Sequence, residues 1–199
     1  AEGVLRAGCD VLDAGMISTD ANYFAIANYG CDGGIQVTAS HNPSEYNGLK
    51  ISREKALPMS YESGLADVER LALQGEMAPV DRRGQVNQKD VVSDWVAHVL
   101  SLAGEIKPLK VVIDAANGMA GKMLPPLLEE LPIEARRMYF ELDGTFPNHE
   151  ANPLKLENLR DLQKEVKESG GDLGVAFDGD ADRCVLVDDR GEPVSSDLV

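Results

Sequence analysis

The sequence predicts an α/β fold: two consecutive three-layer α/β domains with mixed sheets. Short apolar runs of strand length alternate with amphipathic stretches of helix length along the 199 residues. One stretch rich in Gly, Pro and charge, residues 74–89, interrupts this alternation. We therefore predict a first domain over residues 1–88 and a second domain over residues 89–199.

In the first domain, the apolar runs predict three short strands and two helices. Thr19 and Asp20 are good helix N-caps, and Gly30 would end the helix that follows them. Ser60 would cap the second helix in the same way. The predicted strands span residues 9–12, 35–38 and 48–52, and the predicted helices span residues 21–29 and 60–73.

The second domain is predicted to open on an amphipathic helix and then to repeat the strand–helix alternation. Gly170 and Gly171 would stop its last helix, and a long polar loop is expected over residues 142–153. The predicted helices span 90–103, 122–130 and 156–169, and the predicted strands span 110–114, 132–139 and 172–177, with a hairpin over 184–188 and 192–194.

Composition excludes several functional classes. The net charge of −15 disfavours binding to nucleic acid or to an anionic membrane surface, and no apolar run is long enough to span a bilayer. The three cysteines form no CxxC pair, so neither a disulfide framework nor a zinc site is predicted, and a cytoplasmic location is expected. A phosphorylated ligand would need cations gathered locally around it.

The strongest local signal is the run of alternating carboxylates Asp178, Asp180 and Asp182. They can converge on one cation if the backbone curls, and such hard oxygen ligands suit Mg²⁺ or Ca²⁺. A solvated acidic turn is the non-functional alternative. An EF-hand is rejected, because Arg183 stands where that loop needs Gly and Asp189 where it needs Glu.

The second signal is Ser40, which follows a predicted buried strand and could present its hydroxyl to a cleft. His41 and Lys50 could serve proton transfer or charge neutralisation beside it. On local chemistry alone the segment could equally be a plain turn. The glycines at 118 and 121 lack the spacing of a phosphate-binding P-loop. His98 is expected at the surface or in packing, and His149 receives no assignment.

Together these segments resemble the α-D-phosphohexomutases. Residues 38–43 (TASHNP) with 47–50 (NGLK) resemble the phosphoserine loop of that family, and residues 178–183 (DGDADR) resemble its metal loop. Further similar segments are 33–37, 114–118 and 143–148, so that the resemblance covers nearly the whole chain. It implies four domains around a cleft, of which this chain would contain most of the first and the second.

The resemblance also implies roles for the residues. Ser40 would carry the phosphoryl group, and Asp178, Asp180 and Asp182 would bind Mg²⁺ with a phosphoserine oxygen as a further ligand. Lys50 and His41 would be candidates for acid–base work, with Lys50 preferred, and Arg183 would lie against the phosphoserine. The implied substrate is a phosphorylated hexose, which passes between its 1-phosphate and 6-phosphate through a 1,6-bisphosphate.

Residues 143–149 are most similar to the phosphomannomutase/phosphoglucomutase branch of the family. A phosphoglucosamine mutase is one alternative. A metal-stabilised α/β binding module without catalysis and a phosphatase with Asp178 as nucleophile are two others. The missing C-terminal domains of the same enzyme are expected partners, and we do not expect the 199 residues alone to turn over as a mutase.

Overall fold

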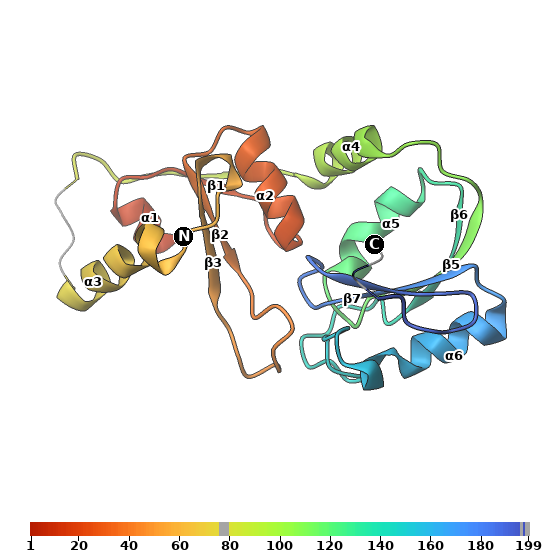
Figure 1. Cartoon of the computed structure of the whole chain (residues 1–199). Coiled ribbons are helices and arrows are strands. Elements are labelled where there is room, and N and C mark those ends of the chain that lie inside the picture. Colours follow the sequence, from red (N-terminus) through yellow and green to blue (C-terminus); the bar gives the residue numbers. More distant parts are fainter. Residues whose placement is uncertain (76–79, 196, 198–199) are drawn as a thin grey trace.

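The computed structural model describes residues 1–75, 80–195 and 197, and its elements form two α/β units in series (Figure 1). We call α1 to β4 the first unit and α4 to β8 the second unit. Residues 76–79 of the predicted linker lie outside the described residues, as do residues 196, 198 and 199. No helix in the described ranges combines the length and the apolar character that a membrane crossing requires.

The first unit contains two small sheets with helices on both sides (Figure 1). β1 and β4 pair in parallel, whereas β2 and β3 form an antiparallel pair joined by the loop that carries Ser40. In order, the elements are α1 (Glu2–Arg6), β1 (Val11–Asp13), α2 (Thr19–Asn28), β2 (Gly33–Val37), β3 (Leu49–Arg53), η1 (Glu54–Ala56), η2 (Tyr61–Leu65), α3 (Ala66–Gln74) and β4 (Val86–Gln88).

The structure differs from the sequence prediction at several points of this unit. Helix α1 was not predicted, and the N-cap of α2 is Ser18 in place of Thr19 or Asp20. Two further corrections concern the segments after β3. β4 lies inside the stretch predicted as a linker. The prediction missed it because its pairing partner β1 is distant in sequence and its three exposed residues show no apolar alternation. The single helix predicted over residues 60–73 is broken: Gly64 has φ 151°, which separates the π-helical turn η2 from α3. Ser60 caps this segment as predicted.

The second unit is a mixed four-stranded sheet between helices. The strand order is β6-β5-β7-β8, with β8 antiparallel to its neighbour and the other pairs parallel. Its elements are α4 (Val92–Leu102), β5 (Leu109–Asp114), α5 (Ala120–Leu128), β6 (Ile133–Met138), η3 (Leu156–Leu159), α6 (Arg160–Ser169), β7 (Leu173–Phe177) and β8 (Cys184–Val187). Successive residues of β5 are buried in different clusters: Val112 packs with α6, and Val111 with Leu128 of α5.

A third apolar cluster joins the two units. Ala21 and Ala25 of α2 are packed with Trp95 of α4 and Met123 of α5, all of them buried. The indole N–H of Trp95 also donates a hydrogen bond of 2.8 Å to a carboxylate oxygen of Asp20. Because each buried large apolar side chain contributes roughly 1.5–3 kcal/mol, this cluster fixes the start of α2 against the second unit.

We expect Trp95→Phe to lower the free energy of unfolding by about 1–3 kcal/mol, because the half-buried Asp20 carboxylate loses its donor. Urea unfolding followed by circular dichroism measures this, since the substitution removes the single tryptophan. Asp20→Asn keeps an acceptor oxygen and is the control, so it should lower the free energy of unfolding by less than Trp95→Phe does. Equal stability of Trp95→Phe and the wild type would contradict the role of this bond.

Candidate functional site

Three loops meet where the two units touch: the Ser40 loop after β2, the loop after β7 that carries the aspartates, and the turn after β5. A Cβ at Gly179 would overlap the carbonyl oxygen of Ser40, and a Cβ at Gly118 would lie 2.7 Å from the carbonyl oxygen of Gly179. The Met119 N–H donates to that Gly179 oxygen at 2.9 Å. Only glycine allows this stacking of three backbones, so residues 118–121 support the site as well as connecting a strand to a helix.

Ser40 is held in a left-handed conformation, with φ 56°, at the meeting point of these loops. Its N–H donates to the Thr38 hydroxyl at 2.8 Å. Its own hydroxyl donates to Asp178 Oδ2 at 3.2 Å and accepts a bond of 2.7 Å from the guanidinium of Arg183. His41 Nδ1 lies 3.5 Å from the serine oxygen and accepts a hydrogen bond from Arg183. The structure thus brings the predicted nucleophile, His41 and Arg183 together.

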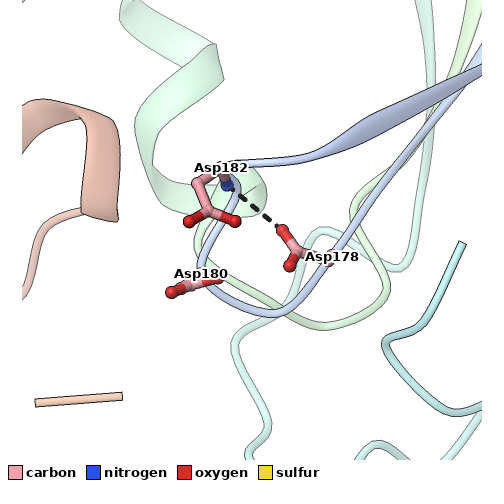
Figure 2. Close-up of side chains that lie close together, drawn as sticks. All are labelled: Asp178, Asp180 and Asp182. Carbon is pink, nitrogen blue, oxygen red and sulfur yellow. Dashed lines mark hydrogen bonds between the residues drawn. The ribbon is translucent and has the colours of Figure 1, made fainter. Parts of the chain in front are cut away.

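The three aspartates share one small volume, as Figure 2 shows. Each offers a carboxylate oxygen, and these oxygens lie within 4.8 Å of one another. Asp178 and Asp180 are buried, and Asp182 is exposed. The loop curls because Asp178 Oδ1 accepts the backbone N–H groups of Asp182 at 3.1 Å and Arg183 at 3.2 Å. The predicted convergence of Ser40 with the aspartates is therefore present in the fold.

Asp180 has one saturated and one unsatisfied oxygen. Oδ2 accepts hydrogen bonds from Thr19 (2.7 Å), Thr38 (3.0 Å) and Lys50 (2.7 Å). Oδ1 is buried and has no hydrogen-bond partner in the part of the chain that the structure describes. A buried acceptor left unpaired costs free energy, and a cation would relieve that cost. Asp178 and Asp182 add two further carboxylates to the cluster, and this set of hard oxygens fits a divalent cation such as Mg²⁺.

Burial and neighbouring charges set the protonation of the cluster. Burial, assisted by the charge of Asp180, raises the pKa of Asp178 above its ordinary value. Burial also opposes ionisation of Asp180, but hydrogen bonds from Lys50 and Thr19 hold its pKa below the ordinary value. Burial would lower the pKa of Lys50, yet its bonds to Asp180 and Asp182 raise it. Lys50 is consequently an ammonium group at neutral pH.

His149, which the sequence left unassigned, connects the long polar loop (residues 142–153) to the end of β5. Its Nε2 lies 2.9 Å from Asp114 Oδ2, and its Nδ1 lies 2.9 Å from the carbonyl oxygen of Glu150. Asp114 is fully buried at the end of β5. A carbonyl can only accept, so both ring nitrogens donate when the imidazole is protonated. The sequence did offer one signal for the role of His149. Asp114 is a charged residue at the end of a predicted buried strand, and such a residue requires a partner.

Comparisons with known proteins place the chain in a family. Family models described as phosphoglucomutase/phosphomannomutase, alpha/beta/alpha domain I and domain II, match residues 1–76 and 93–191. The chain is 45% identical to a phosphomannomutase of Salmonella typhimurium and 39% identical to a protein of Xanthomonas campestris named phosphohexose mutases. These matches cover 96% and 95% of this chain, but only 44% and 43% of the relatives.

A solved structure is similar over nearly the whole chain. It is a phosphoglucomutase/phosphomannomutase family protein from Burkholderia thailandensis, with a TM-score of 0.86 and 34% identity. The match covers 98% of this chain and 43% of that one. The chain therefore spans less than half the length of the proteins it resembles here.

The contact between Gly179 and Ser40 yields a test. Gly179→Ala should lower the free energy of unfolding by about 1–3 kcal/mol, because the added methyl group overlaps backbone that cannot retreat. In a chain of this size each 1 kcal/mol lowers the melting temperature by roughly 2–4 °C. Gly144→Ala is the matched control, since a Cβ there meets nothing within 4 Å. Identical melting of the two variants would refute the close approach.

The His149–Asp114 pair yields a pH dependence. Burial works against protonation of His149, but its bond to Asp114 raises the pKa above the ordinary value of about 6.5. Its stabilising contribution is therefore complete below pH 6.5 and is lost as the pH rises through the higher folded-state pKa. Urea unfolding between pH 6 and 9 gives the free energy of unfolding of the wild type and of His149→Gln. The advantage of the wild type over the variant should shrink as the pH rises. A constant or growing difference would exclude a stabilising imidazolium.

Proposed function

Because the chain belongs to the phosphoglucomutase/phosphomannomutase family, we propose that it carries the phosphoserine loop and the metal loop of a phosphohexomutase. Residues 1–88 would be the domain of the phosphoserine and residues 89–199 the domain of the metal. One observation carries this proposal: the Ser40 hydroxyl is hydrogen-bonded both to Asp178 of the acidic cluster and to Arg183. Nucleophile, metal ligands and a fixed cation thus share one site, as phosphoryl transfer requires.

The proposed substrate is a hexose phosphate, mannose or glucose, that passes between its 1-phosphate and 6-phosphate. The names of the relatives favour this branch over a phosphoglucosamine mutase. A 1,6-bisphosphate would be the intermediate, and either of its phosphates could return to Ser40. Since the chain covers 44% of the relative's length, this whole reaction is proposed for the enzyme in which these two domains take part.

Asp178, Asp180 and Asp182 would hold Mg²⁺, together with a phosphoserine oxygen. The cation would neutralise charge on the group being transferred. The orphaned Oδ1 of Asp180 supports this assignment more strongly than the carboxylate count does, because acidic clusters are common without a metal. Arg183 would supply a second, permanent positive charge beside the phosphoserine.

The chain's own residues divide the proton transfers between them. Formation of the bond from Ser40 Oγ to phosphorus breaks the bond from phosphorus to the sugar oxygen. The serine proton leaves Oγ, and Asp178 Oδ2 is the acceptor to which this hydroxyl already donates. Lys50 is an ammonium group and would provide the proton that the departing sugar oxygen needs. His41 would orient Arg183 through their hydrogen bond, with Nδ1 as acceptor.

The structure disfavours the alternative in which Asp178 is the nucleophile of a phosphatase. The side chain is fully buried. Its Oδ1 accepts two backbone N–H groups, and its Oδ2 accepts bonds from Ser40 and Arg183. Both oxygens of Asp178 are thus already engaged by donors, whereas Ser40 is only partly buried.

Phosphate on Ser40 is the direct test. We expect the chain to gain one phosphoryl group, seen by intact mass, after incubation with glucose 1,6-bisphosphate and Mg²⁺. Peptide mapping should place it on Ser40, and Ser40→Ala should gain none, because the hydroxyl bonded to Arg183 is lost. The label should survive hydroxylamine. A label that hydroxylamine removes would be an acyl phosphate and would favour the phosphatase alternative instead.

A further inference from the structure

A threonine of the first unit holds a predicted metal ligand of the second unit. Thr19 is the first residue of α2 and is fully buried. Its backbone N–H donates to the carbonyl oxygen of Asp180 at 3.0 Å, and its hydroxyl donates to Asp180 Oδ2 at 2.7 Å. Thr19 therefore fixes both the backbone and the side chain of Asp180, from an element anchored in the apolar cluster between the units.

These bonds make the two oxygens of the Asp180 carboxylate unequal. A carboxylate oxygen has two lone pairs, and the hydroxyls of Thr19 and Thr38 alone occupy both on Oδ2. Lys50 is a third donor to the same oxygen. Oδ1, in contrast, is buried and has no partner among residues 1–75, 80–195 and 197. Once the Lys50 ammonium moves aside, the two threonine hydroxyls still occupy both lone pairs of Oδ2, which leaves Oδ1 as the oxygen open to a cation.

We propose that Thr19 is a positioning residue that makes Asp180 a monodentate ligand and thereby favours Mg²⁺ over Ca²⁺. This inference rests on the proposed metal site. Mg²⁺ demands a compact octahedral shell at about 2.0–2.1 Å, which single oxygens supply. Ca²⁺ accepts six to eight ligands and often takes both oxygens of one carboxylate. Freeing Oδ2 would let Asp180 rotate and offer both oxygens, which suits the larger ion better.

Thr19 is better suited to this task than the other two donors. The Lys50 side chain is 30% exposed and also bonds Asp182, so its ammonium can move aside when a cation arrives. Thr38 lies on the Ser40 loop, where its hydroxyl also accepts the Ser40 N–H. Thr19 alone adds a backbone bond to the same residue, and the helix that follows it is packed into the interface between the units.

The test is calorimetric titration of the full chain with MgCl₂ and with CaCl₂, which requires no catalytic turnover. Thr19→Val should weaken Mg²⁺ binding about tenfold or more, in the range typical for residues that orient metal ligands. Ca²⁺ affinity should change much less, so the Mg²⁺/Ca²⁺ affinity ratio falls. Thr19→Ser keeps the hydroxyl and should retain the wild-type ratio. A loss of stability alone would weaken the binding of both ions equally and would leave the affinity ratio unchanged.

Ser18→Ala is the matched control. Ser18 adjoins Thr19 and is equally buried, but its hydroxyl has no hydrogen-bond partner among the described residues, so the affinity ratio should not change. If Thr19→Val does not fold, Thr38→Val replaces it, because this variant frees the same oxygen and should lower the ratio. An unchanged ratio in the folded variant would overturn the inference.

Asp180→Asn separates failure of the inference from failure of the proposed function. It should weaken Mg²⁺ binding, whereas Asp189→Asn, in the exposed turn after β8, should not. If the wild type binds no Mg²⁺, or Asp180→Asn binds it as well as the wild type does, the metal site itself is wrong and the role of Thr19 falls with it. If Asp180→Asn behaves as expected and Thr19→Val keeps the wild-type ratio, only the role of Thr19 is wrong.

Discussion

The packing of α2 against α4 and α5 is the constraint on which the rest of the site depends. Exposed ion pairs contribute little to stability, and Ser40 and the aspartates come from different units. The buried cluster around Ala21, Trp95 and Met123 provides the larger, non-directional stabilisation that brings those units together. The polar contacts then define the geometry: Thr19 to Asp180, Ser40 to Asp178, and Lys50 to Asp180 and Asp182. Burial of apolar area brings the loops together, and the hydrogen bonds determine the geometry in which they meet.

The charge immediately around the site differs from the net charge of the chain. The net charge of −15 would repel a phosphate ester at a distance. At the site, however, Lys50 and Arg183 lie directly against the acidic loop, and the threonine hydroxyls spread the charge of Asp180 over further donors. Three crowded carboxylates are thereby held together before any divalent cation binds. The arrangement resembles a site prepared for a cation more than an acidic turn in solvent.

The sequence predicted much of this fold for identifiable reasons. The strand at 110–114 and the aspartates that follow the strand at 172–177 were readable because parallel strands buried on both faces appear as continuous apolar runs. β4 could not be predicted, since a short exposed strand has no apolar pattern and its partner lies 75 residues away, as the pair Val11 and Val86 shows. The seven candidate residues could be listed from motifs. The contributions of Thr19, Gly118, Gly179 and His149 could not, because each depends on a contact between segments far apart in the chain.

The left-handed backbone of Ser40 has a consequence for how such a chain can change over generations. A residue with a Cβ pays about 1–2 kcal/mol to occupy that region, and glycine does not. Selection for stability alone would therefore favour glycine at this position and would erase the proposed nucleophile. Under the proposed function, the Ser40 hydroxyl supplies what glycine cannot, and the backbone strain is the cost of having it there. In a descendant released from that chemistry, position 40 would be among the first places to relax.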